Sequence, residues 1–229
     1  MRHTRQLLLC AACAKELSKL GDGSLIRLQT GQPTTISGDI DVLITGVGIF
    51  QTTYHLTNAL RDGNYDTVLT AGIAGDFDPN RPLCQTFAVS KTTFADCGFE
   101  NTDGKFLPMT GSIFLDANEY PFHNGYIHNK ASDRLAARLD IPTATANTVC
   151  RTCTDADYVA RMLQQFPSEL ETMESASFAY VCAQRHTDYA EIRCTSNHIV
   201  PKAKEKWQLD PALQVLGNTL ERILKEILG

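Results

Sequence analysis

The stretch from Glu171 to Trp207, ETMESASFAYVCAQRHTDYAEIRCTSNHIVPKAKEKW, constrains the fold of this chain more than any other. Apolar residues at helical spacing predict a helix that opens at Met173 and Glu174, and Ala190–Cys194 is typical of a buried strand. A turn rich in polar residues follows this strand. A helix, a buried strand and a polar turn in that order are typical of α/β proteins, which hold ligands at the carboxyl ends of their strands.

Polar side chains of three kinds are predicted to meet in this stretch. Glu174 lies in the first turn of the helix, where the helix dipole favours an ionised carboxylate. Arg193, Ser196 and Asn197 lie at the carboxyl end of the following strand. An anion that can accept from two hydroxyls, a cation and an amide are therefore expected to converge on one site.

Strands and helices are predicted to alternate along the rest of the chain. The pattern indicates an α/β fold with three layers, α/β/α, around a central mixed sheet, and residues 1–229 are expected to form a single domain. Expected strands are the run that begins at Leu7, Ser24–Thr30, Asp41–Thr45, Asp66–Thr70, Leu83–Ser90, a short strand near Ile113, and Thr143–Val149. Expected helices are Ala12–Leu20, Phe50–Leu60, Ala131–Leu139, Asp155–Phe166 and a terminal helix capped by Asp210 before Pro211.

Composition excludes several classes of function. A net charge of −5 provides no basic surface for a nucleic acid. The apolar run from Leu7 to Ala14 is far shorter than the roughly 20 residues of a membrane span and continues directly into Lys15 and Glu16, so we expect a buried strand there and no membrane association.

The eight cysteines include two C-x-x-C pairs, Cys10 with Cys13 and Cys150 with Cys153. The pairs are far apart in sequence and follow strand-like runs, whereas structural zinc pairs lie closer together. We therefore expect reduced thiols, no metal and no cofactor. Reduced thiols favour a cytoplasmic location.

The pair Met173-Glu174, combined with Arg193-x-x-Ser196-Asn197, resembles the motif of the purine nucleoside phosphorylase and nucleosidase superfamily. The continuation Pro201-Lys202-x-x-x-x-Trp207 resembles the futalosine hydrolases, nucleosidases of an alternative menaquinone pathway, although Lys202 stands where an Arg is more usual. The resemblance implies a nucleoside phosphorylase-like fold. It also implies hydrolysis of the N-glycosidic bond of futalosine, with release of hypoxanthine and dehypoxanthine futalosine.

The resemblance assigns roles to the residues of the motif. Cleavage of the bond develops positive charge on the sugar and negative charge on the base. Glu174 would accept from the 2′- and 3′-hydroxyls, Met173 would pack under the ribose, and Arg193 would orient Glu174 and the attacking water. Asn197, beside Ser196, would contact O6 and N7 of the base, because an amide offers both a donor and an acceptor. An asparagine here favours hypoxanthine or guanine over adenine.

Other segments resemble further parts of the nucleoside pocket. The segment Ala71-Gly72-Ile73-Ala74-Gly75 is similar to a Gly-Ser-Ala-Gly segment that lines it, and Asn147-Thr148-Val149 resembles the segment beside the purine. Glu16 is similar to an acid that helps to activate water, but Ala14 could occupy that place, and an acid in a first helical turn is commonly a dipole partner. Substrate contacts are therefore expected from Ile73, Ala74, Gly75, Thr148, Val149 and Lys202. Lys202 and Lys204 could pair with the benzoate of futalosine or be solvated.

Two features bear on the choice between water and phosphate as the nucleophile. Phosphorylases of this family carry an Arg before the Ala71–Gly75 segment, where this chain has Thr70, and a Gly-rich, Arg-bearing loop after the first strand, where it has Ala11-Ala12-Cys13. Water is therefore expected. A purine nucleosidase of other specificity, a phosphorylase of the same fold and a nucleotide-binding regulatory module without turnover stay open.

Two glycine-containing segments have alternative interpretations. Gly46-Val47-Gly48 lacks the third glycine of a dinucleotide site, because Gln51 fills that position, and is interpreted as a structural turn. The long segment Asn101–Asn129 is either a surface loop or, as the resemblance implies, part of the interface of a homodimer or higher homo-oligomer. Candidates for that interface are Phe106, Met109 and Phe122.

Overall fold

The computed structural model describes residues 6–102, 105–199 and 206–228. Within them, a nine-stranded mixed sheet runs through the centre of the fold in the order β10-β9-β5-β11-β4-β1-β3-β2, with β8 paired to β5. Parallel pairing joins β3 to β1, β1 to β4 and β4 to β11. The strands of this sheet are β1 (Leu7–Ala11), β2 (Thr34–Ser37), β3 (Ile40–Ile44), β4 (Thr67–Asp76), β5 (Thr86–Phe94), β8 (Ile127–His128), β9 (Thr143–Thr148), β10 (Leu170–Thr172) and β11 (Asp188–His198).

Part of the sheet closes on itself. The short strand β10 pairs in parallel with β9 and antiparallel with β4. Because β4 also pairs with β11, β11 with β5, and β5 with β9, these five strands form a closed ring. The ring leaves no free edge at β10, and it places the residues that follow β10 beside the ends of β4 and β11.

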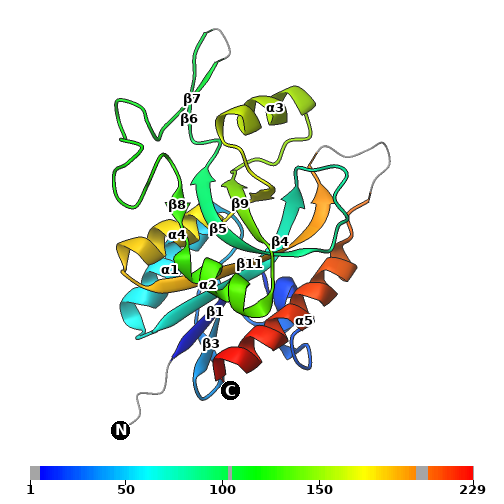
Figure 1. Ribbon diagram of the computed structural model, residues 1–229. Helices are drawn as coiled ribbons and strands as arrows, with labels where there is room; N and C mark the ends of the chain where they lie inside the picture. Colours follow the sequence, from blue (N-terminus) through cyan, green and yellow to red (C-terminus); the bar gives the residue numbers. More distant parts are fainter. Residues whose placement is uncertain (1–5, 103–104, 200–205, 229) are drawn as a thin grey trace.

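Helices cover both faces of the sheet, as the sequence predicts (Figure 1). The helices are α1 (Ile49–Asp62), α2 (Lys130–Leu139), α3 (Ala156–Gln165), α4 (Ser175–Gln184) and α5 (Leu209–Leu228). Alternate residues of β1 point to opposite faces. Leu9 packs in one core with α2 and α5, whereas Leu8 packs in another with α1 and α4. The predicted three-layer α/β/α architecture with a central mixed sheet is confirmed.

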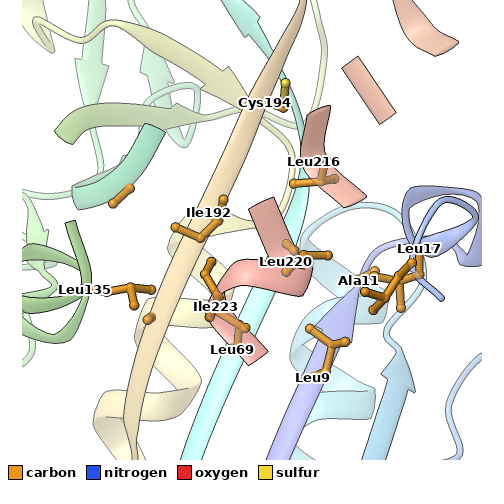
Figure 2. Close-up of a cluster of buried hydrophobic side chains, with 14 of the residues drawn as sticks. Leu9, Ala11, Leu17, Leu69, Leu135, Ile192, Cys194, Leu216, Leu220 and Ile223 are labelled. Carbon is orange, nitrogen blue, oxygen red and sulfur yellow. The ribbon is translucent and has the colours of Figure 1, made fainter. Parts of the chain in front are cut away.

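The larger core lies between the sheet and the helices α2 and α5. Figure 2 shows Leu216, Leu220 and Ile223 of α5 over Leu69 and Ile192 of the central strands. All five side chains are fully buried. Each such side chain contributes roughly 1.5–3 kcal/mol relative to an exposed one, so this packing fixes the position of β4 and β11.

Several predicted elements are wrong or displaced. Ser24–Thr30 forms no strand, because Gly23 adopts a left-handed conformation and begins a short 3-10 helix, η2 (Ser24–Arg27). The helix predicted over Ala12–Leu20 is reduced to the 3-10 turn η1 (Ala14–Leu17). The terminal helix begins at Leu209, so Asp210 lies inside its first turn and is not its cap.

The short strand predicted near Ile113 does not form. Ile113 is 94% exposed and lies in a turn, and not in a strand. Phe122 is a wrong candidate for an interface with a second copy, because it is buried with Phe178 in the core beneath α4. The hairpin formed by β6 (Gly98–Glu100) and β7 (Phe106–Pro108) projects from the body of the fold (Figure 1), and Phe106 lies half-buried in it.

Candidate active site

A cavity of about 290 Å³ opens at the carboxyl ends of β1, β4 and β11. The segments that follow β9 and β10 complete its wall. Most of the residues that the motif singles out meet there, although they come from positions far apart in the sequence. The lining residues include Ala12, Cys13, Lys15, Glu16, Val47, Ile73, Ala74, Gly75, Thr152, Cys153, Thr154, Glu171, Thr172, Met173, Glu174, Ser196, Asn197, His198, Ile199, Lys206 and Trp207.

Glu174 is the N-terminal cap residue of α4, one position before the helix and not inside its first turn as predicted, and its carboxylate is held from two sides. The backbone N–H of Gly48 donates to Glu174 Oε1 at 2.8 Å, and Arg193 Nη1 lies 3.6 Å from Glu174 Oε2. Gly48 has a φ of +87°, a left-handed conformation that favours glycine. The N-terminal end of the helix and the guanidinium both place positive charge beside this buried carboxylate.

Arg193 lies in a buried network of charges behind the cavity. Its Nε donates to Glu191 Oε1 at 2.7 Å, and the Ser175 hydroxyl donates to the same oxygen. Burial lowers the pKa of Arg193, but the carboxylates of Glu191, Glu174 and Glu16 more than offset this and raise the pKa above its ordinary value. Arg193 is therefore a permanent cation whose position is fixed.

Glu16 also lies close to Arg193, and its carboxylate accepts hydrogen bonds from three backbone N–H groups. Glu16 Oε1 accepts from Ile73 N at 3.0 Å, and Oε2 accepts from Ala12 N at 2.9 Å and Cys13 N at 3.1 Å. Burial raises the pKa of Glu16, and Glu174 adds to the rise, whereas Arg193 and the backbone donors oppose it. Because burial holds the pKa of Glu16 above its ordinary value, the carboxylate is a stronger base than an exposed glutamate.

Gly72 allows these charges to approach the sheet. A Cβ atom at this position would lie 2.5 Å from both Arg193 Nη1 and Glu16 Oε1. Any side chain would displace one of the two groups. The absence of a side chain at Gly72 therefore leaves room for both charged groups.

Asn197 faces the other end of the cavity. The register between β11 and β4 shifts between Thr195 and Asn197, so Ser196 is the extra residue of a bulge, a feature that re-aims side chains beside active sites. Ser196 Oγ donates to Asn197 Oδ1 at 2.9 Å. This bond orients the amide. Its nitrogen also donates to His198 O at 3.5 Å, which leaves a second N–H for an acceptor in the cavity.

The structure brings together most of the predicted site residues, but not all. Glu16, Ile73, Ala74, Gly75, Met173, Glu174, Ser196 and Asn197 line one cavity, and Arg193 contacts Glu174 from behind it. Thr148 and Val149 do not line it. The Thr148 hydroxyl accepts from Ala176 N at 2.8 Å, and Val149 packs in a separate core with Met162 and Phe166. Lys202 and Lys204 lie outside the described residues.

Four contributors to the site were missed by the sequence analysis. Val47 and Gly48 reach it through the glycine turn that was interpreted as structural. Residues 152–154 replace Thr148 and Val149 in the wall, and Lys206 adds a cation near the opening. Glu171 is buried in the wall, and neither of its carboxylate oxygens has a hydrogen-bond partner among the described residues. Two features of the sequence could have indicated some of these residues: the glycine turn, and the acid two residues before Met173.

The cysteines are free thiols, and they include both C-x-x-C pairs. Among residues 6–102, 105–199 and 206–228, no group of three or more His, Cys, Asp or Glu side chains is arranged to hold a metal ion. No helix in this part of the chain combines the length and the apolar character needed to cross a membrane.

Comparison with known proteins agrees with this geometry. The family model described as the phosphorylase superfamily matches residues 34–229. A futalosine hydrolase from Streptomyces coelicolor is 31% identical over 189 residues, which cover 80% of this chain and 77% of that protein.

Two solved structures share the fold. The futalosine hydrolase of Helicobacter pylori has a TM-score of 0.73 at 14% identity, covering 99% of this chain and 100% of that one. The 5′-methylthioadenosine/S-adenosylhomocysteine nucleosidase of Neisseria meningitidis has a TM-score of 0.72 at 17% identity, covering 98% of each chain. The chain therefore belongs to the phosphorylase superfamily and, within it, to the futalosine hydrolase family.

Proposed function

We propose that this protein hydrolyses the N-glycosidic bond of futalosine and releases hypoxanthine and dehypoxanthine futalosine. One observation carries the proposal. The carboxylates of Glu174 and Glu16 and the oriented amide of Asn197 line a single cavity, and the fixed guanidinium of Arg193 contacts Glu174 from behind it. This arrangement suits a reaction that develops positive charge on a sugar and negative charge on a leaving base.

The sugar end of the reaction is assigned to Glu174 and Met173. Glu174 Oε1 and Oε2 are oriented by Gly48 and Arg193, so the carboxylate can accept from the 2′- and 3′-hydroxyls of a ribose. Hydrogen bonds to a charged acceptor contribute about 1.5–3 kcal/mol each. The negative charge of Glu174 also stabilises the oxocarbenium ion as it forms.

The attacking water is assigned to Glu16. Its pKa is raised mainly by burial, and Arg193 lies beside it, so it can accept a proton from water as the bond to the base breaks. The alternative, that Glu16 is a partner of the helix dipole, also has some support, because Glu16 Oε2 accepts from two N–H groups at the start of η1. Oε1 accepts a single N–H, and a carboxylate oxygen has a second lone pair for a water.

The leaving base is assigned to Asn197. Its oxygen accepts the Ser196 proton, so its N–H₂ donates into the cavity and can stabilise N7 or O6 of the departing base. Both of these atoms are acceptors in hypoxanthine. This supports a 6-oxopurine as the base.

Water is favoured over phosphate by the charges of the cavity. The carboxylates of Glu16 and Glu174 line it, and Arg193 is already engaged by Glu191 and Glu174. A phosphate dianion beside these carboxylates would be repelled. The cations among the described lining residues, Lys15 and Lys206, are exposed and suit the carboxylate of a substrate at the opening of the cavity.

The proposal is tested by incubating the protein with futalosine in phosphate-free buffer and measuring the released hypoxanthine by chromatography. Inosine and methylthioadenosine serve as competing substrates. Hydrolysis of futalosine to a free sugar is expected. Base release that requires phosphate and yields a sugar 1-phosphate would establish a phosphorylase, and absence of any base release would favour a regulatory nucleotide-binding module.

We also propose a cytoplasmic homo-oligomer, of a single domain per chain, that acts in menaquinone biosynthesis. The free thiols suit a reducing compartment. Exposed apolar side chains gather on the segment around the β6–β7 hairpin, where an interface would cover Phe99, Leu107, Ile113 and Phe114. Light scattering that reports a monomer at micromolar concentration would rule out the assembly.

A further inference from the structure

Residues 150–154, called the wall segment below, complete the candidate site but make few contacts of their own. Thr152, Cys153 and Thr154 line the cavity. No hydrogen bond joins these three residues to any other part of the chain that the structure describes. Arg151, directly before them, lines a second cavity of about 600 Å³. With cavities beside consecutive residues, the position of the wall segment depends on the contacts at its two ends.

The helix α3 fixes the C-terminal end of the wall segment. Asp155 is the N-terminal cap of this helix, and its Oδ1 accepts from Tyr158 N at 2.8 Å. The ring of Tyr158 also contacts Arg151, whose Cζ lies 5.1 Å from the ring centroid. Arg151 is exposed, and cation–π contacts at exposed sites are weak. The N-terminal end therefore needs a stronger contact.

Asp96 supplies that contact. Asp96 Oδ2 accepts from Cys150 N at 2.7 Å and from Arg151 N at 3.2 Å. Its other oxygen, Oδ1, is buried and has no hydrogen-bond partner among the described residues. Burial raises the pKa of Asp96, and the two backbone N–H groups oppose the rise. Hydrogen bonds to an ionised acceptor are roughly twice as strong as those between neutral groups.

The central sheet in turn holds Asp96. This residue follows β5 by two positions, and its neighbour Ala95 donates from its backbone N to Thr148 O at 2.9 Å. Both β5 and β9 belong to the closed ring of strands. The carboxylate of Asp96 thus joins the ring to the wall segment.

We propose that Asp96 is a positioning residue that fixes the wall segment, so that Thr152, Cys153 and Thr154 meet the substrate in one arrangement. The two hydroxyls and the thiol carry no charge to balance the charges that develop as the bond breaks. Their contacts should therefore stabilise the ground state and the transition state equally, which lowers KM without raising kcat. The proposal rests on the proposed function in so far as futalosine is the substrate of the kinetic test.

Limited digestion with trypsin tests the anchor without any substrate. Trypsin cleaves after arginine, and the bond from Arg151 to Thr152 lies in the wall segment. Asp96→Ala should raise the rate of cleavage at this bond at least ~10-fold, measured by mass spectrometry, because a segment that opens locally is cut faster. Asp96→Asn should be cut at the wild-type rate, since one amide oxygen can still accept both backbone N–H groups.

Steady-state kinetics with futalosine test the consequence for the site. Asp96→Ala should raise KM at least ~5-fold and change kcat by less than about twofold. Asp96→Asn should keep both constants near their wild-type values. Asp22→Ala is the matched control and should change neither constant. It also removes the acceptor of a backbone N–H, that of Ser24 at 2.9 Å, but in a loop outside the cavity.

A double-mutant cycle separates an effect through the wall segment from an effect of Asp96 itself. The pair Thr152→Ala and Thr154→Ala should raise KM. Adding Asp96→Ala to this pair should raise KM by less than about twofold more, because the contacts that Asp96 supports are already lost. Fully additive effects would overturn the inference.

Equal cleavage of the wild type and Asp96→Ala would also overturn it, as would a fall in kcat at unchanged KM. If Asp96→Ala fails to fold, Asp96→Leu decides by the same measurements, since leucine fills the space without offering an acceptor. The proposed function fails separately. A protein in which the wall segment is released by Asp96→Ala and kept by Asp96→Asn, but which does not hydrolyse futalosine, would retain the anchor and lose only the assigned reaction.

Discussion

Arg193 Nε donates to Glu191 Oε1 at 2.7 Å, and the two side chains are at most 2% exposed. Arg138 and Glu226 form an ion pair of similar length, 2.6 Å, but their side chains are 57% and 46% exposed. The two ion pairs therefore have nearly equal N–O distances, but one pair is buried and the other is exposed. Only the buried pair positions a group of the candidate site.

Glu191→Gln should be much more destabilising than Glu226→Gln. Removing one partner of a buried ion pair costs roughly 3–5 kcal/mol, whereas an exposed pair contributes about 0–1 kcal/mol. Urea unfolding of both variants provides the comparison. We also expect Glu191→Gln to lower kcat by about tenfold with little change in KM, because Arg193 would lose the group that orients it. Equal loss of stability in the two variants would contradict the role of burial.

Glu174→Gln should lower kcat by at least ~10²-fold while leaving the fold intact, because interactions that are stronger in the transition state than in the ground state would be lost. The amide oxygen can still accept from Gly48 N, so the local geometry should be kept. Steady-state kinetics with futalosine and a thermal melt measure the two effects. A variant with near-normal kcat would show that Glu174 does not stabilise the transition state.

Asn197→Asp should shift the choice of base. An aspartate suits the amino group of adenine and serves O6 of hypoxanthine poorly, so the ratio of kcat/KM for inosine-type over adenosine-type substrates should fall by at least ~10-fold. Ser196→Ala should produce a smaller fall, because the amide would lose the hydroxyl that orients it. An unchanged ratio in Asn197→Asp would mean that this residue does not contact the base.

Glu171→Gln should flatten the pH dependence of stability. The pKa of Glu171 is about 8 in the folded protein, against an ordinary value of 4.5. Between these values the folded state keeps a proton that the unfolded state releases, so the free energy of unfolding falls as pH rises from about 4.5 to 8. At about 1.4 kcal/mol per pH unit, the fall amounts to up to about 5 kcal/mol.

Urea midpoints at pH 5, 6.5 and 8 measure this effect. Glu16 also has a raised pKa and contributes a fall of the same sign, so the difference between wild type and Glu171→Gln isolates Glu171. Parallel curves for the two proteins would show that Glu171 is ionised across this range.

Gly72→Ala should reduce kcat/KM by at least ~10-fold, because the new Cβ atom would displace Arg193 or Glu16. Gly38→Ala is the matched control, since a Cβ atom there meets nothing within 4 Å. Both substitutions remove the same backbone freedom in the unfolded chain. Equal kinetics in the two variants would place Arg193 and Glu16 outside the catalytic geometry.

The sequence allowed the centre of the site to be predicted because its signals are local. Glu174 begins a helix, and Arg193, Ser196 and Asn197 end a strand, so periodicity and spacing are sufficient to locate them. The layers of the fold were predictable for the same reason. Strands buried on both faces are mostly apolar, as in β1 and in β3, where Asp41 is the exception, and helices such as α3 carry an apolar stripe.

Features that depend on contacts between distant segments could not be predicted from the sequence. The bond from Gly48 N to Glu174 joins residues 126 positions apart, and no local pattern indicates it. Thr148 and Val149 were predicted at the site because they end a strand. They instead pack inward, since β10 and α4 cover that end of β9. The three residues of β10 are too few for a periodic pattern, so the position of Glu171 was also hidden.

The closed ring of β4, β10, β9, β5 and β11 limits how easily the strands around the cavity can open. A strand at the edge of an open sheet can fray alone, whereas β10 must break hydrogen bonds with two neighbours at once to move. Met173 and Glu174 follow it directly in the chain. The walls that carry Glu174 and Asn197 thus belong to one closed ring of strands, and amide hydrogens of β10 should exchange with solvent only when the whole ring opens.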